Sequence, residues 1–382
     1  MANNNRIYYP MQQVAFRKPG TTVYREAHGV QSVAITTTFN LEQAFELGQL
    51  AIYENIEGIP NVEVTLNKVL DGYPLLYCLA TATNAAGTTI EKPQLVQRAV
   101  GETVMSLGIW PETQEAVSGL PSTFCEMSGL TVSSVSYTFP SEGNFTEDLS
   151  LAGFNKVWST YVTGASECEA PWATGSPTGA PSFQDNADAP IGSGGVNQRE
   201  NMIWAISNQQ ASSAGGGDYG ILPTDIPGVQ GSGFLNRSIA HISNVSVSTD
   251  FSREDLFELG SRSPYARTVT FPVEVTCSID VISVSGDLVN ALDNCNADVA
   301  CETPSNLSDQ KIRLATCEGT RIYLGEKNKL SSVSYGGGDA GGGNVTVTYE
   351  YQTFNDFTVL HSGDNFNTSG QDIWSKRSNY LT

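Results

Sequence analysis

The sequence predicts a mainly β protein in which one domain occurs twice. The composition contains 37 Gly and 17 Pro among 382 residues, as expected for many strands joined by turns. Segments such as residues 61–70 alternate apolar and polar residues, which is the period of a strand with one buried face. The stretch at residues 33–48 recurs at residues 245–260, which indicates an internal duplication.

The recurring stretch is the strongest of these signals. Its two copies, VAITTTFNLEQAFELG and VSVSTDFSREDLFELG, align without a gap and share the ending FELG. Further matches follow in the same order along both halves. They are VEVT at 62–65 and 273–276, SSVSY at 133–137 and 331–335, and a gapless match of 143–155 with 343–355. Collinear matches of this kind favour a duplicated domain over chance reuse of Ser, Thr and Val.

Each copy of the stretch is expected to form a strand followed by a short helix. Residues 33–38 alternate as a half-buried strand does. Asn40 and Ser252 stand where an N-cap would begin a helix, and Gly48 and Gly260 stand where it would end. The expected architecture is therefore a β-sandwich or barrel with a flanking short helix.

Other elements follow the same periodicities. In the first repeat, residues 94–107 have apolar residues near helical spacing after Pro93 and are expected to be a helix. Strands are expected at 61–70, 127–139, 144–158, 271–284, 312–324, 330–335 and 344–360.

The chain divides by composition into five segments. The connection between the repeats is rich in Gly, Pro, Ser and Asp, with a short ordered piece expected near residues 202–206. The N-terminal segment is polar with interspersed aromatics and either docks on a neighbouring subunit or is a disordered tail. The segments are the N-terminal arm 1–30, repeat one 31–163, the connection 164–235, repeat two 236–361 and the C-terminal tail 362–382.

The charge balance limits the possible partners. The formal net charge is −20, which opposes tight binding to nucleic acid phosphates or to an anionic membrane. No apolar stretch approaches the length of a membrane span, and residues 1–10 lack the apolar region of a signal peptide. The 7 cysteines are odd in number and contain no C-x-x-C pair, which favours free thiols.

No spacing in the sequence indicates catalysis, a cofactor or a metal. The histidines, His28, His241 and His361, do not form a metal-binding or nucleophilic pattern, and the glycine runs lack the Lys-Ser/Thr of a phosphate loop. The acidic cluster around Asp293 and Asp298 fits no calcium loop. The sequence therefore predicts a protein without enzymatic activity or cofactor.

Carboxylates at matched positions are the candidate functional residues. Glu63 and Glu274 lie between valines of the VEVT matches, so both are expected on the outer face of a strand. A solvated strand position is the simplest reading of each, and a repeated acidic surface is the functional one. Candidates for contacts between subunits come from the shared FELG ending: Phe45, Glu46, Gly48, Phe257, Glu258 and Gly260.

The first repeat contains, at residues 36–77, the stretch TTTFNLEQAFELGQLAIYENIEGIPNVEVTLNKVLDGYPLLY. This stretch and the related block in the second repeat resemble the tail tube (major tail) proteins of phages. The resemblance covers both repeats and leaves residues 164–235 unexplained. It implies a tail-tube-like β domain whose copies close into rings that stack as a tube. Because two domains lie in one chain, it implies a pseudo-hexameric ring of three chains.

The resemblance also implies partners and place. The chain would be a structural virion protein of the phage tail, assembled in the host bacterial cytoplasm from homotrimeric rings. Its other partners would be tail proteins such as the tape measure, the tail tip or baseplate and the terminator. DNA would pass through during ejection without specific binding, and Glu63 and Glu274 would face the lumen, where carboxylates repel phosphates.

Two alternatives remain open at the level of sequence. A baseplate hub or tube initiator with paired tube domains would form rings that do not propagate. A carbohydrate-binding β-sandwich of the virion surface would need exposed aromatic side chains, for which Trp158, Trp172 and Trp204 are candidates, although Trp158 is expected in the core.

Overall fold

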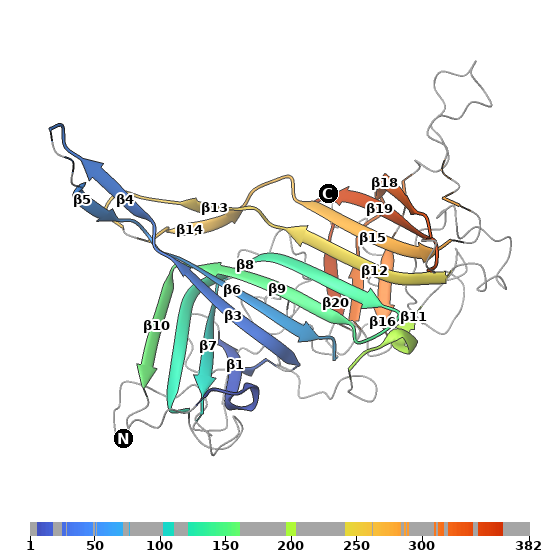
Figure 1. The fold of residues 1–382 in the computed structure, drawn as a ribbon, viewed down its shortest axis with the longest axis horizontal. Helices are drawn as coiled ribbons and strands as arrows, with labels where there is room; N and C mark the ends of the chain where they lie inside the picture. Colours follow the sequence, from blue (N-terminus) through green and yellow to red (C-terminus); the bar gives the residue numbers. More distant parts are fainter. Residues whose placement is uncertain are drawn as a thin grey trace, which may run out of the picture.

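The computed structural model shows a mainly β chain, as the sequence predicts (Figure 1). Among the described residues it contains the 3-10 turns η1 (Tyr9–Met11) and η2 (Arg199–Asn201), and Leu76 is helical. The structure describes residues 6–17, 25–27, 29–48, 50, 52–71, 76, 102–110, 121–160, 196–203, 241–261, 263–283, 286–287, 289, 309–310, 312–316, 320–338 and 343–361.

A long antiparallel sheet runs through both halves of the chain. From one end to the other its strands follow the order β3, β6, β9, β8, β12, β15, β19, β18. The first four are β3 (Val30–Thr38), β6 (Asn61–Val69), β9 (Thr146–Gly153) and β8 (Thr123–Pro140). The others are β12 (His241–Asp250), β15 (Glu274–Ile282), β19 (Thr346–Phe354) and β18 (Lys329–Gly336).

One strand order occurs twice in this sheet. In each half the first strand pairs with the second, the second with the fourth, and the fourth with the third along the chain. The recurring sequences fall on equivalent strands. The matched triplets TTF (37–39) and TDF (249–251) lie at the ends of β3 and β12, and SSVSY lies in β8 and β18. The halves join because β8 pairs antiparallel with β12 over Asn244↔Pro140 to Asp250↔Ser134.

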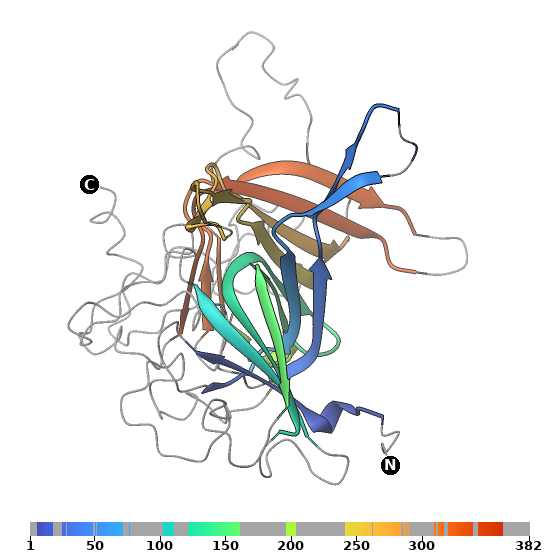
Figure 2. The same cartoon turned by 90° about the vertical axis from the view of Figure 1, so that its left-hand side faces the viewer.

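Two smaller sheet regions lie against the apolar face of the long sheet (Figures 1 and 2). Beneath the first half, the N-terminal part of β8 (residues 123–130) pairs with β7 (Thr103–Ile109) and β10 (Asn155–Thr160). On its other side β7 pairs with β1 (Gln12–Arg17), which pairs with β2 (Arg25–Glu26). Beneath the second half lie β11 (Met202–Ile203), β16 (Arg313–Thr316), β17 (Thr320–Tyr323) and β20 (Thr358–His361).

The core between these layers is a single apolar cluster. Alternate residues of each long strand point into it, such as Val62, Val64 and Leu66 of β6. Tyr137 packs edge-on against Phe357 at a centroid distance of 6.5 Å, which links the two halves. Cys277 is buried and free, and burial raises its pKa to about 12, so its thiol is an inert core group.

The prediction of flanking helices at residues 40–48 and 252–260 is wrong. Those residues form the hairpins β4–β5 and β13–β14, which leave the same end of the sheet in Figure 1. The strands are β4 (Leu41–Phe45), β5 (Ile52–Glu57), β13 (Arg253–Leu256) and β14 (Ala266–Val269). A glycine with positive φ is typical both of a helix end and of a hairpin turn, and here Gly48 and Gly260 adopt φ values of +94° and +91° in the turns. Segments this short cannot sustain an isolated helix, whereas a partner strand is close at hand.

Two further expectations differ from the structure. Thr103–Ile109 is strand β7 and not part of a helix, because its buried residues on both faces fit a sheet between β1 and β8. Residues 12–17 of the expected arm form β1, with Val14, Ala15 and Phe16 buried against β7. Most of the connection 164–235 and the tail 362–382 lie outside the described residues, while residues 202–203 of the expected ordered piece form β11.

Candidate functional site: a polar sheet face between two open edges

The outer face of the long sheet is polar along its whole width. Its outward positions carry Ser, Thr, Asn and Gln side chains together with carboxylates, because each strand alternates a buried apolar residue with an exposed polar one. Lys329, at the start of β18, is a cation on the same face, and its Nζ lies 3.6 Å from Asp309 Oδ1. The carboxylates on this face are Glu63, Asp148, Asp250, Glu274, Asp280 and Glu350.

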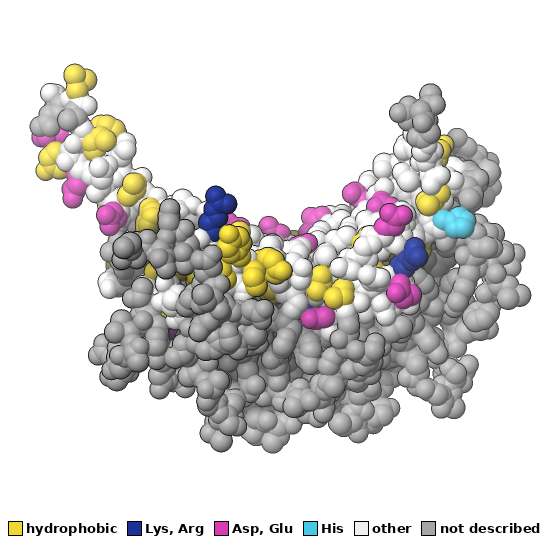
Figure 3. All heavy atoms as spheres, turned by 60° about the horizontal axis from the view of Figure 1, so that its bottom comes forward, with side chains coloured by type: hydrophobic (Ala, Val, Ile, Leu, Met, Phe, Trp, Pro, Cys, Tyr) yellow, Lys and Arg dark blue, Asp and Glu magenta, His cyan; other side chains and the backbone are white. Residues whose placement is uncertain are grey.

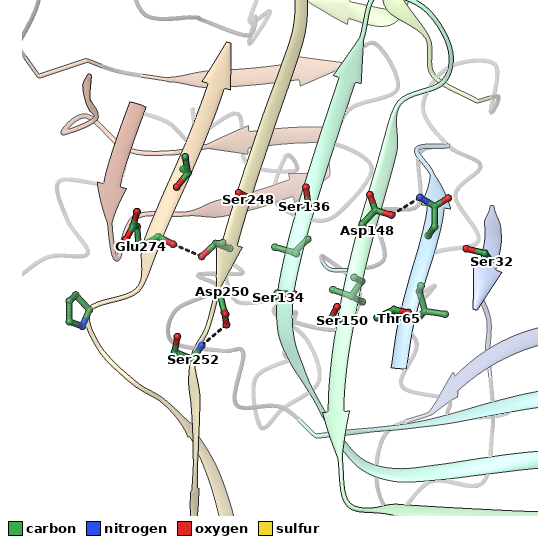
Figure 4. A pocket seen from close by; sticks show the side chains of 17 residues that line it. Ser32, Thr65, Ser134, Ser136, Asp148, Ser150, Ser248, Asp250, Ser252 and Glu274 are labelled. Carbon is green, nitrogen blue, oxygen red and sulfur yellow. Dashed lines mark hydrogen bonds between the residues drawn. The ribbon is translucent and has the colours of Figure 1, made fainter. Parts of the chain in front are cut away.

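A shallow trough of about 720 Å³ occupies the middle of this face. Figure 4 shows its lining, with Ser136, Ser150 and Ser248 contributed by adjacent strands and Asp148 and Asp250 among them. The space-filling view shows acidic side chains along the hollow between two projections (Figure 3). A surface of hydroxyls and carboxylates offers many acceptors and almost no positive charge, so it repels polyanions.

Neighbouring donors hold several of these carboxylates in place. Asn67 Nδ2 donates to Asp148 Oδ1 at 2.5 Å, and Ser332 Oγ donates to Glu350 Oε2 at 2.6 Å. Asp280 accepts from Thr348 Oγ1 at 2.6 Å and from Asn244 Nδ2 at 3.0 Å. The donors are neutral, so the hydrogen bonds fix the side chains without cancelling the charge of the face.

Glu63 and Glu274 both lie exposed on this face, as their position between buried valines predicts. They are not at equivalent places. Thr37 and Thr249 are matched residues, and they pair with Val62 and Val275 respectively. By this register Glu63 corresponds to Thr276, so the two carboxylates are offset by two residues, or about 7 Å along the strand. The VEVT match places the strand correctly and its register wrongly.

The long sheet ends in two strands with open edges. Among the described residues, β3 pairs with β6 alone and β18 pairs with β19 alone. Side chains at these edges are more exposed than their counterparts at the β8–β12 junction. Tyr335 of β18 is 53% exposed, whereas the matched Tyr137 of β8 is 0% exposed. Open edges of this length offer a template for pairing with another chain.

The two hairpins carry the remaining candidates. Phe45 and Phe257 are exposed near the hairpin ends, and Glu46 and Glu258 are exposed beside them. Gly48 and Gly260 are the turn residues described above. Both hairpins expose large apolar side chains, which are candidates for contacts with another protein. They are Leu41, Phe45, Leu47, Leu50, Ile52, Tyr53 and Ile56 on the first hairpin, and Phe257, Leu259 and Tyr265 on the second.

The aromatic residues of the carbohydrate-binding alternative are only partly described. Trp158 of β10 is 50% exposed, so the prediction that it lies in the core is wrong. Trp172 and Trp204 lie outside the described residues. In the part of the chain that the structure describes, no group of three or more His, Cys, Asp or Glu side chains could hold a metal. No helix among those residues is long and apolar enough to cross a membrane.

Sequence reasoning missed a pair of arginines at the base of the second hairpin. Arg253 and Arg267 lie on the paired strands β13 and β14, and both line a small pocket beside the polar face. Periodicity predicts a helix here, so it separates two side chains that the hairpin brings together. The difference between FSREDLFELG and FNLEQAFELG at this position was the available signal.

No protein-family model matches the chain, and no curated protein sequence matches it. Among solved structures, the chain is similar to the tube-terminating cap of the anti-feeding prophage, with a TM-score of 0.29 and 15% identity over 42% of this chain and 95% of that one. A chain of the anti-feeding prophage baseplate gives a TM-score of 0.27 and 10% identity, covering 41% and 98%. A chain of the sheath–tube complex of an extracellular contractile injection system gives 0.29 and 11%, covering 41% and 94%.

Proposed function

We propose that this chain is a tail tube subunit of a DNA phage, and that its copies associate side by side into rings that stack as a conduit for DNA. The observation that carries the proposal is the β8–β12 junction between two halves of the same strand order. It joins the third strand of one half to the first strand of the next. The open edges are a third strand, β18, and a first strand, β3, so a second copy can repeat the junction.

The internal junction gives the register of the proposed pairing. Tyr137 lies opposite Val247, and Ser136 lies opposite Ser248. The matched residues of the open edges are Tyr335 and Ser334 on β18, and Ile35 and Thr36 on β3. Tyr335 of one copy therefore lies opposite Ile35 of the next, and Ser334 opposite Thr36. Pairing in this register covers Tyr335 as β12 covers Tyr137.

Continued pairing removes every open edge once the sheet closes into a ring. Each chain contributes two domain repeats, at residues 31–163 and 236–361, so a pseudo-hexameric ring needs three chains. With the apolar face covered by the smaller sheets, the polar face is the one available to line a channel. Glu63 and Glu274 then face a lumen whose negative charge keeps DNA from adhering.

The hairpins and the segments outside the long sheet supply contacts beyond the ring. Phe45, Glu46 and Gly48, with Phe257, Glu258 and Gly260, are proposed to contact neighbouring subunits or rings. The assembly is proposed to work in the virion with the tape measure, the tail tip or baseplate and the terminator, after formation in the host bacterial cytoplasm. No cofactor and no enzymatic activity belong to this function.

Electron microscopy of the purified protein over a range of concentration and salt tests the polymer. Stacked hollow rings are expected, with averages showing three chains per ring. Rings that do not stack would instead favour a hub or tube initiator. Protein that stays monomeric even after addition of a tail-tip complex would contradict the proposal, and glycan binding by that monomer would favour the carbohydrate-binding alternative.

Paired cysteine substitutions test the register. Ser334→Cys with Thr36→Cys is expected to give oxidised oligomers, because directly opposed residues lie within the 4.4–6.8 Å typical of disulfide Cα atoms. Ser136→Cys with Ser248→Cys is the matched positive control, since that pair is opposed within one chain. Ser334→Cys with Ser32→Cys shifts the register by about 13 Å and should not crosslink. Equal crosslinking by both edge pairs would contradict the proposed pairing.

A further inference from the structure

A pocket of about 430 Å³ lies where the bases of the two hairpins meet the polar face. Asn40 and Pro60 line it from the first hairpin, and Arg253, Asp255 and Arg267 line it from the second. It is separate from the trough in the middle of the sheet, with which it shares none of its lining residues. Two guanidinium groups in one pocket are unusual in a chain of net charge −20.

The two arginines have only part of their hydrogen-bonding capacity satisfied. Arg267 donates from Nε to Asp255 Oδ1 and, at 3.0 Å, from Nη2 to Asp255 Oδ2. Arg253 donates from Nε to the carbonyl oxygen of Val132. Nη1 and Nη2 of Arg253 and Nη1 of Arg267 are buried and have no hydrogen-bond partner among the residues that the structure describes. Buried donors of charged groups are normally satisfied, so these atoms mark a place for an acceptor.

The charges in the pocket do not balance. Arg267 is 9% exposed and is paired with Asp255, while Arg253 has no carboxylate within ion-pair distance among the described residues. Burial, and then the charge of Arg267, lowers the pKa of Arg253 to about 10, which leaves it protonated at neutral pH. Two guanidinium groups and one carboxylate leave one positive charge that water alone does not neutralise.

The corresponding place in the first hairpin lacks this arrangement. The matched stretches put Leu41 at the position of Arg253 and Gln43 at that of Asp255. Gln43 pairs with Asn55 as Asp255 pairs with Arg267. The pocket is therefore specific to the second hairpin, and in a ring of three chains it would occur three times and not six.

We propose that this pocket binds a single carboxylate group, supplied by an acidic side chain of a second copy of the chain or by a free small carboxylate. A carboxylate fits because one negative charge balances the pocket, and because its two oxygens match the planar donors of guanidinium groups. A second copy can supply it, since the chain has 40 Asp and Glu residues against 20 Lys and Arg. That source rests on the proposed assembly, whereas the free-ligand source does not.

Thermal unfolding at pH 7, with sodium acetate replacing chloride at constant ionic strength, tests the free-ligand source. The unfolding midpoint of the wild type is expected to rise with acetate and to saturate, since a ligand of the native state stabilises it. Arg253→Leu, which installs the residue of the first hairpin, should lose that rise. Arg199→Gln removes an exposed cation elsewhere and should keep it. If Arg253→Leu does not fold, Asp255→Asn serves in its place and should increase the acetate-dependent rise, because it leaves a second guanidinium unpaired.

Assembly at low acetate tests the second-copy source. Arg253→Leu is expected to raise the protein concentration needed for rings or tubes at least tenfold, with Arg199→Gln unchanged. An effect on assembly without one from acetate assigns the carboxylate to a second copy, and the reverse assigns it to a small molecule. No effect in either arm would overturn the proposal and leave the pocket to water. A wild type that stabilises with acetate yet never forms rings would contradict the proposed function while sustaining the pocket.

Discussion

The junction between the two halves of the sheet and the two open edges contain matched residues in different surroundings. Tyr137 and Phe251 at the junction are both 0% exposed. Their counterparts at the edges, Tyr335 and Phe39, are 53% and 69% exposed. The side chains have the same chemistry, and the difference is the neighbouring strand. A residue type suited to the core is thus left at the surface wherever the chain ends its own sheet.

The comparison also shows where the two halves have diverged. Tyr137 donates to Glu147 Oε1 at 2.7 Å, and the same oxygen accepts from the backbone N–H of Leu76 at 2.8 Å. In the second half Val347 lies opposite Tyr335, in the place that Glu147 takes opposite Tyr137. A buried polar network within the first half therefore holds Tyr137 in place beside the internal junction, whereas the matched Tyr335 at the edge lies opposite an apolar residue. We expect the internal junction to be permanent and the edge junction to form on assembly.

Removing the aromatic ring at the junction should have the largest effect on stability. Tyr137→Ala opens a cavity at the contact with Phe357 and removes a donor to Glu147. Loss of a large buried aromatic side chain costs about 3–5 kcal/mol. Chemical denaturation of the monomeric chain, followed by tryptophan fluorescence, measures the loss.

Tyr335→Ala is the matched control for that variant. Its free energy of unfolding should change by less than about 0.5 kcal/mol in the monomer, as for a surface substitution. Ring formation should nevertheless weaken, because the ring loses a contact that only the next copy covers. Equal destabilisation of the two monomers would show that the open edge is already covered within one chain, and would break the comparison.

The buried carboxylate should give the next largest effect. Glu147→Ala leaves the Tyr137 hydroxyl and the Leu76 N–H without their acceptor. Buried groups stripped of a partner cost about 1–3 kcal/mol each, so for two groups we expect a loss of at least about 2 kcal/mol. Glu147→Gln keeps an acceptor oxygen and should lose less. The same denaturation experiment measures both, and an unchanged free energy of unfolding in Glu147→Ala would show that the network does not stabilise the chain.

The sequence predicts the strands well because alternation reports burial directly. The β6 segment NVEVTLNKV shows its buried Val62, Val64 and Leu66 as every second residue. Local pattern could not predict the hairpins, because Asn40 and Gly48 are typical of the ends of a helix and of a β-turn alike. Only the pairing of β4 with β5 distinguishes a hairpin from a helix here. The β8–β12 pairing brings together residues more than a hundred positions apart, a non-local choice that no local pattern encodes.

For the candidate site, too, the sequence predicts which residues are exposed but not which residues lie next to them. That Glu63 and Glu274 are exposed follows from their neighbours, but their register depends on the partner strands, and the short VEVT match misplaced it by two residues. Arg253 and Arg267 could not be associated by spacing, since a turn of unknown length separated them. Local pattern thus gives the face of a residue, while tertiary pairing gives its neighbours.

Hairpin substitutions should affect assembly with little change in monomer stability. Phe45→Ser and Phe257→Ser remove exposed apolar side chains, so the monomer should change by less than about 0.5 kcal/mol. Ring or tube formation should fall in each, because the removed surface is proposed to contact neighbouring copies. Sedimentation velocity at several concentrations measures it. Arg199→Gln, an exposed change outside the hairpins and both edge strands, is the control, and unaffected assembly of both Phe variants would exclude the hairpins as contact surfaces.

Charge reversal on the polar face should have the smallest effect on the chain and a specific effect on the tube. Glu63→Lys with Glu274→Lys changes exposed residues, so folding and ring formation should persist. If this face lines the channel, the added cations should make assembled tubes retain DNA. That retention should weaken as salt rises, because each phosphate contact contributes a slope of about −0.9 in log K against log[salt] for duplex DNA.

Co-sedimentation of labelled DNA with the tubes measures this retention. The control, Glu63→Gln with Glu274→Gln, removes the same carboxylates without adding cations. Equal retention by the Lys and Gln variants would show that the face does not meet DNA, and would leave the open edges as evidence for a ring whose channel is lined by another surface.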